Sequence, residues 1–181
     1  MLHITIPALE QWDDEKQEFV YTKKQELRLE HSLVSLAKWE SKWCKPFLGK
    51  EPKTYEQTID YIKFMTLTQN VPEEVYQRIT KENIDQVNQY IDAPMTATWF
   101  SDKKTARQAS REQITAEIVY YWMVALNIPF ECEKWHLNRL LTLIRVCEIK
   151  SQPQKKMSKK ELLSRNAALN AVRRKQFNKK G

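Results

Sequence analysis

Glycine is scarce in this chain of 181 residues, which contains only Gly49 and Gly181. Tight turns and close backbone approaches commonly need glycine, so two glycines favour helices joined by few tight turns. The same scarcity excludes the glycine-rich loops that bind phosphates and dinucleotides, since those loops need several glycines at fixed spacing. Hydrophobic residues still make up 41% of the chain, which is enough for the core of one domain. We therefore expect a mostly helical fold.

The first thirty residues predict a small antiparallel sheet. Apolar and polar residues alternate over residues 2–6, and β-prone residues recur over 18–22 and 25–30. Residues 12–16 are mostly polar and predict a turn between the first two of these strands. With the helices that follow, these strands predict the α+β class: a mostly α-helical domain with a small N-terminal antiparallel β-sheet.

Helical periodicity replaces the alternation from about residue 32 onward. Ser32 predicts the N-cap of the first helix, and Thr54 with Gln57 predicts a capping box at the second. Pro72 and Thr80 predict the starts of two more helices. Four helices are therefore expected before residue 95.

Two later helices, expected over residues 110–126 and 133–148, are the most apolar and are expected at the centre of the core. The first runs through the apolar residues Ile114, Ile118, Tyr121, Trp122, Ala125 and Leu126. The second carries one apolar stripe, formed by Leu137, Leu140, Leu141, Ile144 and Cys147.

The positive charge is concentrated at the C-terminal end. Residues 150–181 contain eleven Lys and Arg against one acid, Glu161, a net charge of +10, whereas the whole chain carries +7 and residues 1–149 therefore carry −3. We expect a single globular α+β domain over 1–149 and a basic helical arm over 150–181, which begins with a capping box at Ser158. A basic arm indicates a negatively charged partner, either nucleic acid or an acidic protein surface.

The basic arm also contains apolar residues, which leaves three interpretations open. It is a solvated tail, a nucleic-acid contact that gains affinity by counterion release, or an amphipathic helix that docks on a protein. Apolar residues that need to be covered argue against a purely solvated tail and favour protein docking. These residues are Leu162, Leu163, Leu169, Val172 and Phe177.

The titratable residues form no recognisable catalytic or metal-binding set. His3, His31 and His136 are far apart in the sequence, and the three cysteines include no CxxC pair. We expect the histidines to be core or surface residues with satisfied hydrogen bonds and the cysteines to be free thiols. No enzyme activity, metal or other cofactor is expected.

Membrane and secretion signals are not expected either. No run of about 18 apolar residues occurs, and the N-terminus lacks the basic and apolar regions of a signal peptide. We therefore expect no association with a membrane.

Trp39 and Trp43 have two interpretations. Helical spacing places them with Phe47 on or near one apolar stripe, which favours burial in the core. If part of this cluster is exposed, it is a surface for a partner.

Several sequence blocks resemble a group of small proteins encoded in the tail-morphogenesis region of tailed phages. The first block is residues 29–40, LEHSLVSLAKWE, and the second is MTAT at 95–98. The third is WHLNRLLTLIR at 135–145. The fourth begins with MSKKE at 157–161 and continues with Arg165, Asn166, Leu169, Asn170, Arg173 and Arg174. Together these blocks span most of the chain.

This resemblance implies a tail assembly chaperone. Such proteins are non-enzymatic, act in the host cytoplasm and are absent from the finished virion. The partners that the resemblance implies are the tape measure protein, which the chaperone coats, and tail tube subunits, which it recruits. A homo-oligomer is left open.

The alternative function is a virion structural or head–tail connector protein whose basic arm contacts DNA, in which case the protein lies in the virion. For either function we expect the partner contacts to come from two aromatic residues and from the basic arm. The candidate residues are Trp39, Trp43, Leu162, Leu163, Leu169, Arg173 and Arg174.

Overall fold

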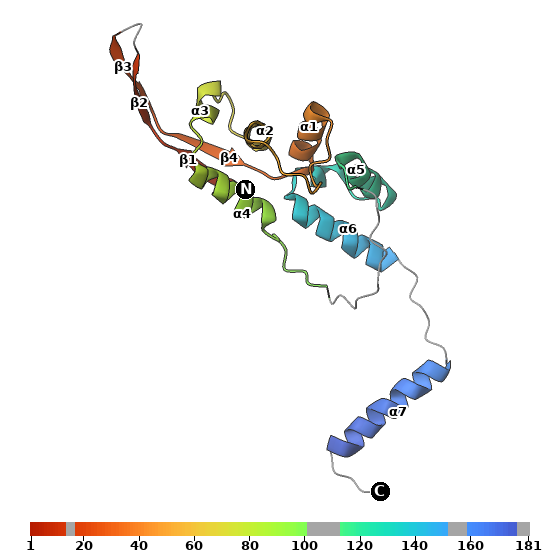
Figure 1. Cartoon of the computed structure of the whole chain (residues 1–181). Helices are drawn as coiled ribbons and strands as arrows, with labels where there is room; N and C mark the ends of the chain where they lie inside the picture. Colours follow the sequence, from red (N-terminus) through yellow and green to blue (C-terminus); the bar gives the residue numbers. More distant parts are fainter. Residues whose placement is uncertain (14–16, 101–112, 152–158, 177–181) are drawn as a thin grey trace. The chain divides into compact units, whose positions relative to one another are not determined.

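The computed structural model describes residues 1–13, 17–100, 113–151 and 159–176 (Figure 1). The strands are β1 (Leu2–Ile6), β2 (Leu9–Asp13), β3 (Glu18–Thr22) and β4 (Gln25–Leu29). The helices are α1 (Leu33–Trp43), α2 (Tyr55–Met65), α3 (Glu73–Gln77), α4 (Lys81–Asp92), α5 (Ala116–Ala125), the 3-10 helix η1 (Phe130–Lys134), α6 (Leu137–Ser151) and α7 (Lys159–Gln176). The expected α+β class, mostly helical with strands at the N-terminus, is confirmed.

The chain divides into two compact units, Met1–Glu148 and Ile149–Gly181. The first contains the four strands and the helices as far as most of α6, and the second contains α7.

The four strands form one long antiparallel hairpin with a break in the middle. β1 pairs with β4 and β2 with β3, and in both ladders the numbers of paired residues add up to 31. The break places Pro7 and Ala8 opposite Lys23 and Lys24. Proline has no N–H group to donate, so the backbone ladder cannot continue through Pro7.

The expected strand arrangement is wrong in two respects. Trp12 and Asp13 belong to β2 and not to a turn, and the first strand pairs with β4 and not with the next strand along the chain. Polar composition suggested a turn over 12–16, of which 14–16 lie outside the described residues. The ring pair of Trp12 and Phe19, with centroids 4.9 Å apart, supports pairing out to that point.

One face of β1 and β4 belongs to the core. Ile4, Ile6, Leu27 and Leu29 are almost completely buried and alternate with exposed residues along their strands. Figure 1 shows α4 beside this part of the hairpin, and α4 contacts β1. This half of the hairpin is therefore held by the protein's own helices.

Local sequence signals set the helix starts as expected. Ser32, Thr54 and Thr80 are N-caps, and each takes part in a reciprocal capping box with the residue three positions later. The side chains buried between the helices come mainly from α1, α2, α5 and α6. They include Leu33, Leu36, Trp39, Ile59, Ile62, Met65, Val119, Met123, Leu137, Leu140 and Ile144.

The helix α5 buries only part of the apolar run that was expected at the centre of the core. The helix begins at Ala116, and it buries Ala116, Val119 and Met123, whereas Tyr121 is 68% exposed. The expected start at 110–112 lies outside the described residues. α5 is apolar on all sides, so periodicity cannot say which side faces the core. The polar contacts at its N-terminus help to fix its orientation.

Glu40 provides the main contact of this kind. This buried carboxylate accepts two backbone hydrogen bonds of 2.7 Å, one from the N–H of Phe47 and one from the N–H of Ala116. It therefore joins α1 to the segment that follows it and to the first residue of α5. Nothing in the local sequence indicates this contact, because Ala116 is 76 residues away.

We predict that Glu40→Gln lowers the free energy of unfolding by about 1–3 kcal/mol, because the amide nitrogen cannot accept and one buried N–H loses its partner. Urea denaturation at pH 7 measures the change. Glu26→Gln, an identical substitution at an exposed position of β4, is the matched control. Equal losses in the two variants would contradict the role of Glu40.

Candidate interaction surfaces

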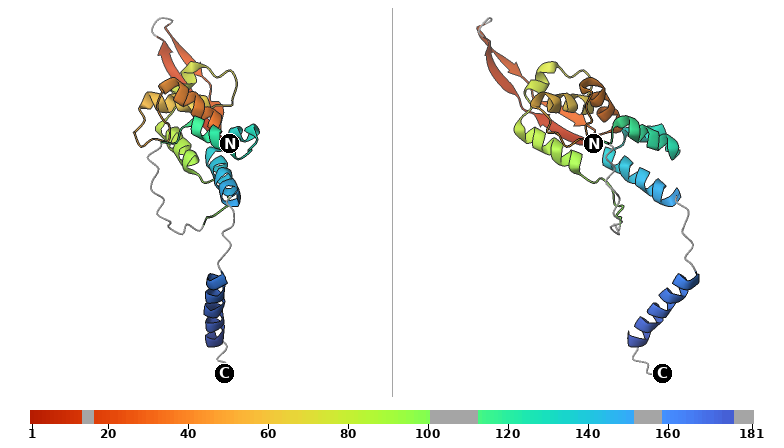
Figure 2. Two further views of the ribbon diagram at one scale, coloured as in Figure 1. Left: turned by 90° about the vertical axis from the view of Figure 1, so that its right-hand side faces the viewer. Right: turned by 45° about the vertical axis from the view of Figure 1, so that its right-hand side comes forward.

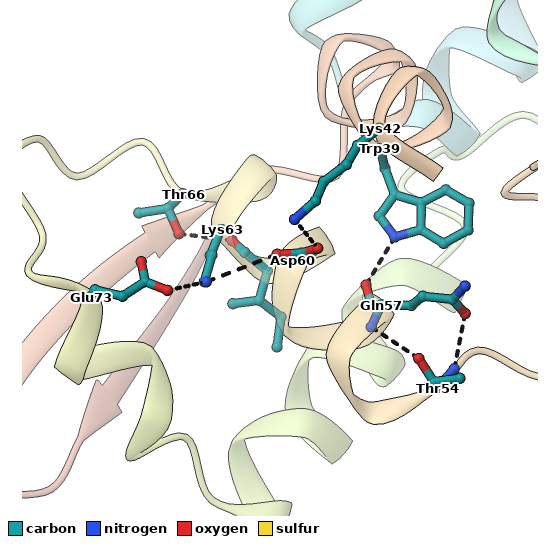
Figure 3. A network of polar contacts seen from close by, with 9 residues as sticks. Trp39, Lys42, Thr54, Gln57, Asp60, Lys63, Thr66 and Glu73 are labelled. Carbon is teal, nitrogen blue, oxygen red and sulfur yellow. Dashed lines mark hydrogen bonds and ion pairs between the residues drawn. The ribbon is translucent and has the colours of Figure 1, made fainter. Parts of the chain in front are cut away.

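Trp39 is a core residue. Its side chain is 2% exposed, its indole N–H donates to the carbonyl oxygen of Gln57 over 2.8 Å, and its ring packs edge-on against Phe47. Figure 3 shows this contact between α1 and α2. Trp39 therefore presents no surface to a partner, and of its two interpretations, burial in the core is the one that holds.

Trp43 lies partly buried at the end of α1. Its ring centroid is 6.4 Å from that of Trp39, and the Lys42 ammonium lies 5.5 Å from its ring. Within the described part of the chain, its buried indole N–H has no hydrogen-bond partner. Trp43 thus keeps part of its ring accessible, but it does not form an exposed aromatic pair with Trp39.

The polar residues near Trp39 are engaged within the protein. The Asp60 carboxylate on α2 forms an ion pair with the ammonium of Lys42 on α1, 2.5 Å away (Figure 3). It also lies 3.9 Å from the ammonium of Lys63, which forms a second ion pair with Glu73 of α3. These contacts link three helices. We assign this region to the scaffold, with the modest stabilisation that is usual for partly exposed ion pairs.

The segment between β4 and α1, residues 30–32, forms hydrogen bonds with the ends of three helices. The N–H of Glu30 donates to the carbonyl of Met65 at the end of α2. The carbonyl of His31 accepts from the N–H of Leu137 at the start of α6. The Glu30 carboxylate accepts from the hydroxyl of Tyr90, near the end of α4. We call this segment the 30–32 junction.

Two buried histidines meet at the 30–32 junction. Nδ1 of His31 lies 2.5 Å from the hydroxyl of Tyr61, and the rings of His31 and His136 are 5.1 Å apart. Nε2 of His136 donates to the carbonyl of Tyr90, while its Nδ1 accepts from the N–H of Asn138. His136 is therefore held as a neutral tautomer with both ring nitrogens engaged.

Burial disfavours charge on both rings. It lowers the pKa of His31 to about 3, helped by the neighbouring His136, and burial also lowers the pKa of His136. Both imidazoles are therefore neutral and buried, with exposed fractions of 1% for His31 and 6% for His136. Among the described residues, no three His, Cys, Asp or Glu side chains are grouped so that they could hold a metal ion.

The helix α7 presents its side chains to solvent. The side chains described here, those of residues 163–174, are all exposed. On a helix of 3.6 residues per turn, Leu169 and Val172 share one side, whereas Leu163 lies on another side, which it shares with Arg174 about three turns further along. Arg173 lies next to the side of Leu169 and Val172. The side chain of Leu162 and residue Phe177 lie outside the described set.

The candidate residues are therefore only partly brought together. Leu169, Val172 and Arg173 form a small apolar and basic side of α7, and Leu163 and Arg174 lie apart from it. Trp39 and Trp43 belong to the other unit.

Two exposed apolar surfaces were not predicted from the sequence. On β2 and β3, the rings of Trp12, Phe19 and Tyr21 are exposed. At α5 and η1, the exposed side chains are Tyr121, Val124 and Phe130. A helix that is apolar all round is normally buried, so the composition of α5 could have signalled the second surface. The first was hidden by the polar residues around Trp12.

In comparisons with known proteins, no family model, curated protein or solved structure matches this chain. The functional interpretation thus depends on the residues themselves. In addition, no helix in the described segments combines the length and hydrophobicity that crossing a membrane requires.

We predict that the fold loses stability below neutral pH because of His31. The pKa is 6.5 for an ordinary histidine and about 3 in the folded protein, so between these values the unfolded chain binds more protons. Stability is thus fully present above about pH 6.5 and falls as the pH is lowered towards 3. From pH 7 to pH 5, His31 alone lowers the free energy of unfolding by about 2 kcal/mol.

Urea denaturation at the two pH values measures this loss. His31→Asn should shrink the difference between pH 7 and pH 5, whereas His3→Asn, at an exposed position, should preserve it. An unchanged difference in His31→Asn would assign the pH dependence to other groups.

Proposed function

We propose that this protein is a tail assembly chaperone of a tailed phage, which acts in the host cytoplasm by binding other proteins and not by catalysis. The resemblance of four sequence blocks supports the assignment. The observation that carries it is α7, a helix with apolar and basic side chains exposed together. The proposed clients are the tape measure protein and tail tube subunits.

The apolar side of α7 is too small to bind a client tightly by itself. Leu169 is 46% exposed and Val172 is 53% exposed. Burying a fully exposed Leu or Val side chain stabilises by about 1.5–3 kcal/mol, so covering these two contributes about 2 kcal/mol. Micromolar binding needs about 8 kcal/mol. In this proposal the net charge of +10 speeds association, and other surfaces supply the remaining affinity.

The charge of the basic arm also supports the alternative function, a virion structural or connector protein that contacts DNA. Lys and Arg side chains on phosphates release counterions, and the affinity then falls steeply with salt. Docking through Leu169 and Val172 depends less on salt, because apolar burial is not screened. The two functions therefore differ in a measurable way.

The first test is co-expression with the tape measure protein, using the full chain and a chain that ends after Ser151, which keeps α6 complete. The chaperone proposal predicts a soluble complex with the full chain and at least about tenfold weaker binding without the arm. No complex with the full chain would overturn the proposal.

Point variants separate the two functions. We predict that Leu169→Ser with Val172→Ser weakens client binding about tenfold, whereas Leu163→Ser, on another side of α7, has little effect. If the arm instead contacts DNA, the purified chain binds duplex DNA with a steep dependence on salt, and Arg173→Gln with Arg174→Gln reduces that slope by about 2. Client binding that is indifferent to Leu169 and Val172 would exclude this side of α7 as the contact.

A further inference from the structure

The second half of the hairpin carries an uncovered aromatic face. We call the strands β2 and β3 together the β-arm. Trp12, Phe19 and Tyr21 form a row on it, with ring centroids 4.9 Å apart for the first pair and 6.4 Å for the second. Tyr21 is 70% exposed. In all the views of Figures 1 and 2, β2 and β3 extend beyond the helices of their unit.

This aromatic face continues the buried face of β1 and β4. The paired residue numbers add up to 31 on both sides of the break, so the two ladders have the same register. The break contains two residues on each strand, an even number, so side chains alternate between the two faces in the same order before and after it. Ile6 and Trp12 lie on the same side of the hairpin, and so do Leu27 and Phe19. Helices bury the first half of this side, while the second half is open.

A hairpin of two strands gains little stability by itself, so a row of exposed aromatic rings at its end is costly to keep in water. Packing within the unit does not explain the row. The buried side chains of the hairpin are those of Ile4, Ile6, Leu27 and Leu29, all on β1 and β4. An occupant that covers the row would complete the layer that the helices begin.

The charge of the β-arm indicates which occupant fits. The two strands of the β-arm contain three acids, Glu10, Asp13 and Glu18, and no lysine or arginine, a net charge of −3. Glu10 pairs with Tyr21 across the two strands and hydrogen-bonds to its side chain, so acidic charge lies within the aromatic row itself. Two copies of this face would bring −3 against −3, which opposes self-association. Lys and Arg, in contrast, are attracted both to the acids and to the faces of exposed aromatic rings.

We propose that the aromatic face of the β-arm is a docking surface for a basic amphipathic helix of another protein. The apolar side of that helix would lie on Trp12, Phe19 and Tyr21, and its Lys and Arg would flank Glu10. Helices cover the other half of the hairpin in the same way. This proposal is independent of the tail assembly function and of α7.

The probe is a fluorescently labelled peptide made of leucine and lysine, about 18 residues long, with the leucines at helical spacing. Its control has glutamate in place of each lysine. Fluorescence anisotropy at pH 7 with the full chain measures both affinities. We expect the lysine peptide to bind at least tenfold more tightly than the glutamate peptide, and its affinity to fall with salt.

Matched variants locate the binding. Trp12→Thr with Tyr21→Thr keeps residues that favour strands and should weaken binding of the lysine peptide at least tenfold. Trp99→Thr removes a tryptophan that is 84% exposed elsewhere, and Tyr121→Thr removes an exposed aromatic from α5, so both should leave the affinity unchanged. Glu10→Lys keeps every ring of the row and should still weaken binding, which separates docking from a loss of folding.

Three results would overturn the proposal. Equal affinity of the Trp12 and Tyr21 double variant and the unaltered chain would place the peptide elsewhere. Equal binding of the lysine and glutamate peptides would show that the acids of the β-arm do not select a basic partner. A dimer in sedimentation that the double variant abolishes would identify a second copy as the occupant.

Discussion

The structure depends on the 30–32 junction, where the sheet ends and the helices begin. Glu30 and His31 contact the end of α2, the start of α6 and the last turn of α4. The contacts are polar and at least partly buried, and each needs its partner in place, because an unsatisfied buried group costs about 1–3 kcal/mol. His31 and His136 fit only as neutral rings. The junction therefore fixes the mutual arrangement of these helices through hydrogen bonds that have direction, which apolar packing lacks.

Local features were predictable from the sequence, and distant contacts were not. The N-caps at Ser32 and Thr54 follow from residues three positions apart, so a short window contains the information. The pairing of β1 with β4 depends on a break at Pro7 and on an aromatic pair beyond it. The buried side of α5 depends on Glu40, from a helix 76 residues earlier. Periodicity gives no orientation where a helix is apolar all round, so the sequence did not predict which side of α5 faces the core.

The candidate contacts divide in the same way. The concentration of positive charge in the arm is a property of composition and needs no structure to detect. Whether Trp39 faces a partner or the core depends on packing, and its burial and the hydrogen bond from its indole N–H to the carbonyl of Gln57 place it in the core. The aromatic row of the β-arm was not predicted because Trp12 lies among polar residues, with Asp13 directly after it, and such a composition is also typical of turns.

The separation between the junction and the exposed surfaces affects how binding should be interpreted. The β-arm, α5 and α7 carry aromatic and aliphatic side chains whose contact with a partner does not require a titration near neutral pH. The 30–32 junction, in contrast, loses stability as soon as its histidines can be protonated in the unfolded chain. A loss of binding between pH 7 and pH 5 that is accompanied by unfolding would therefore report on the junction. A loss without unfolding would report on the surface that binds the partner.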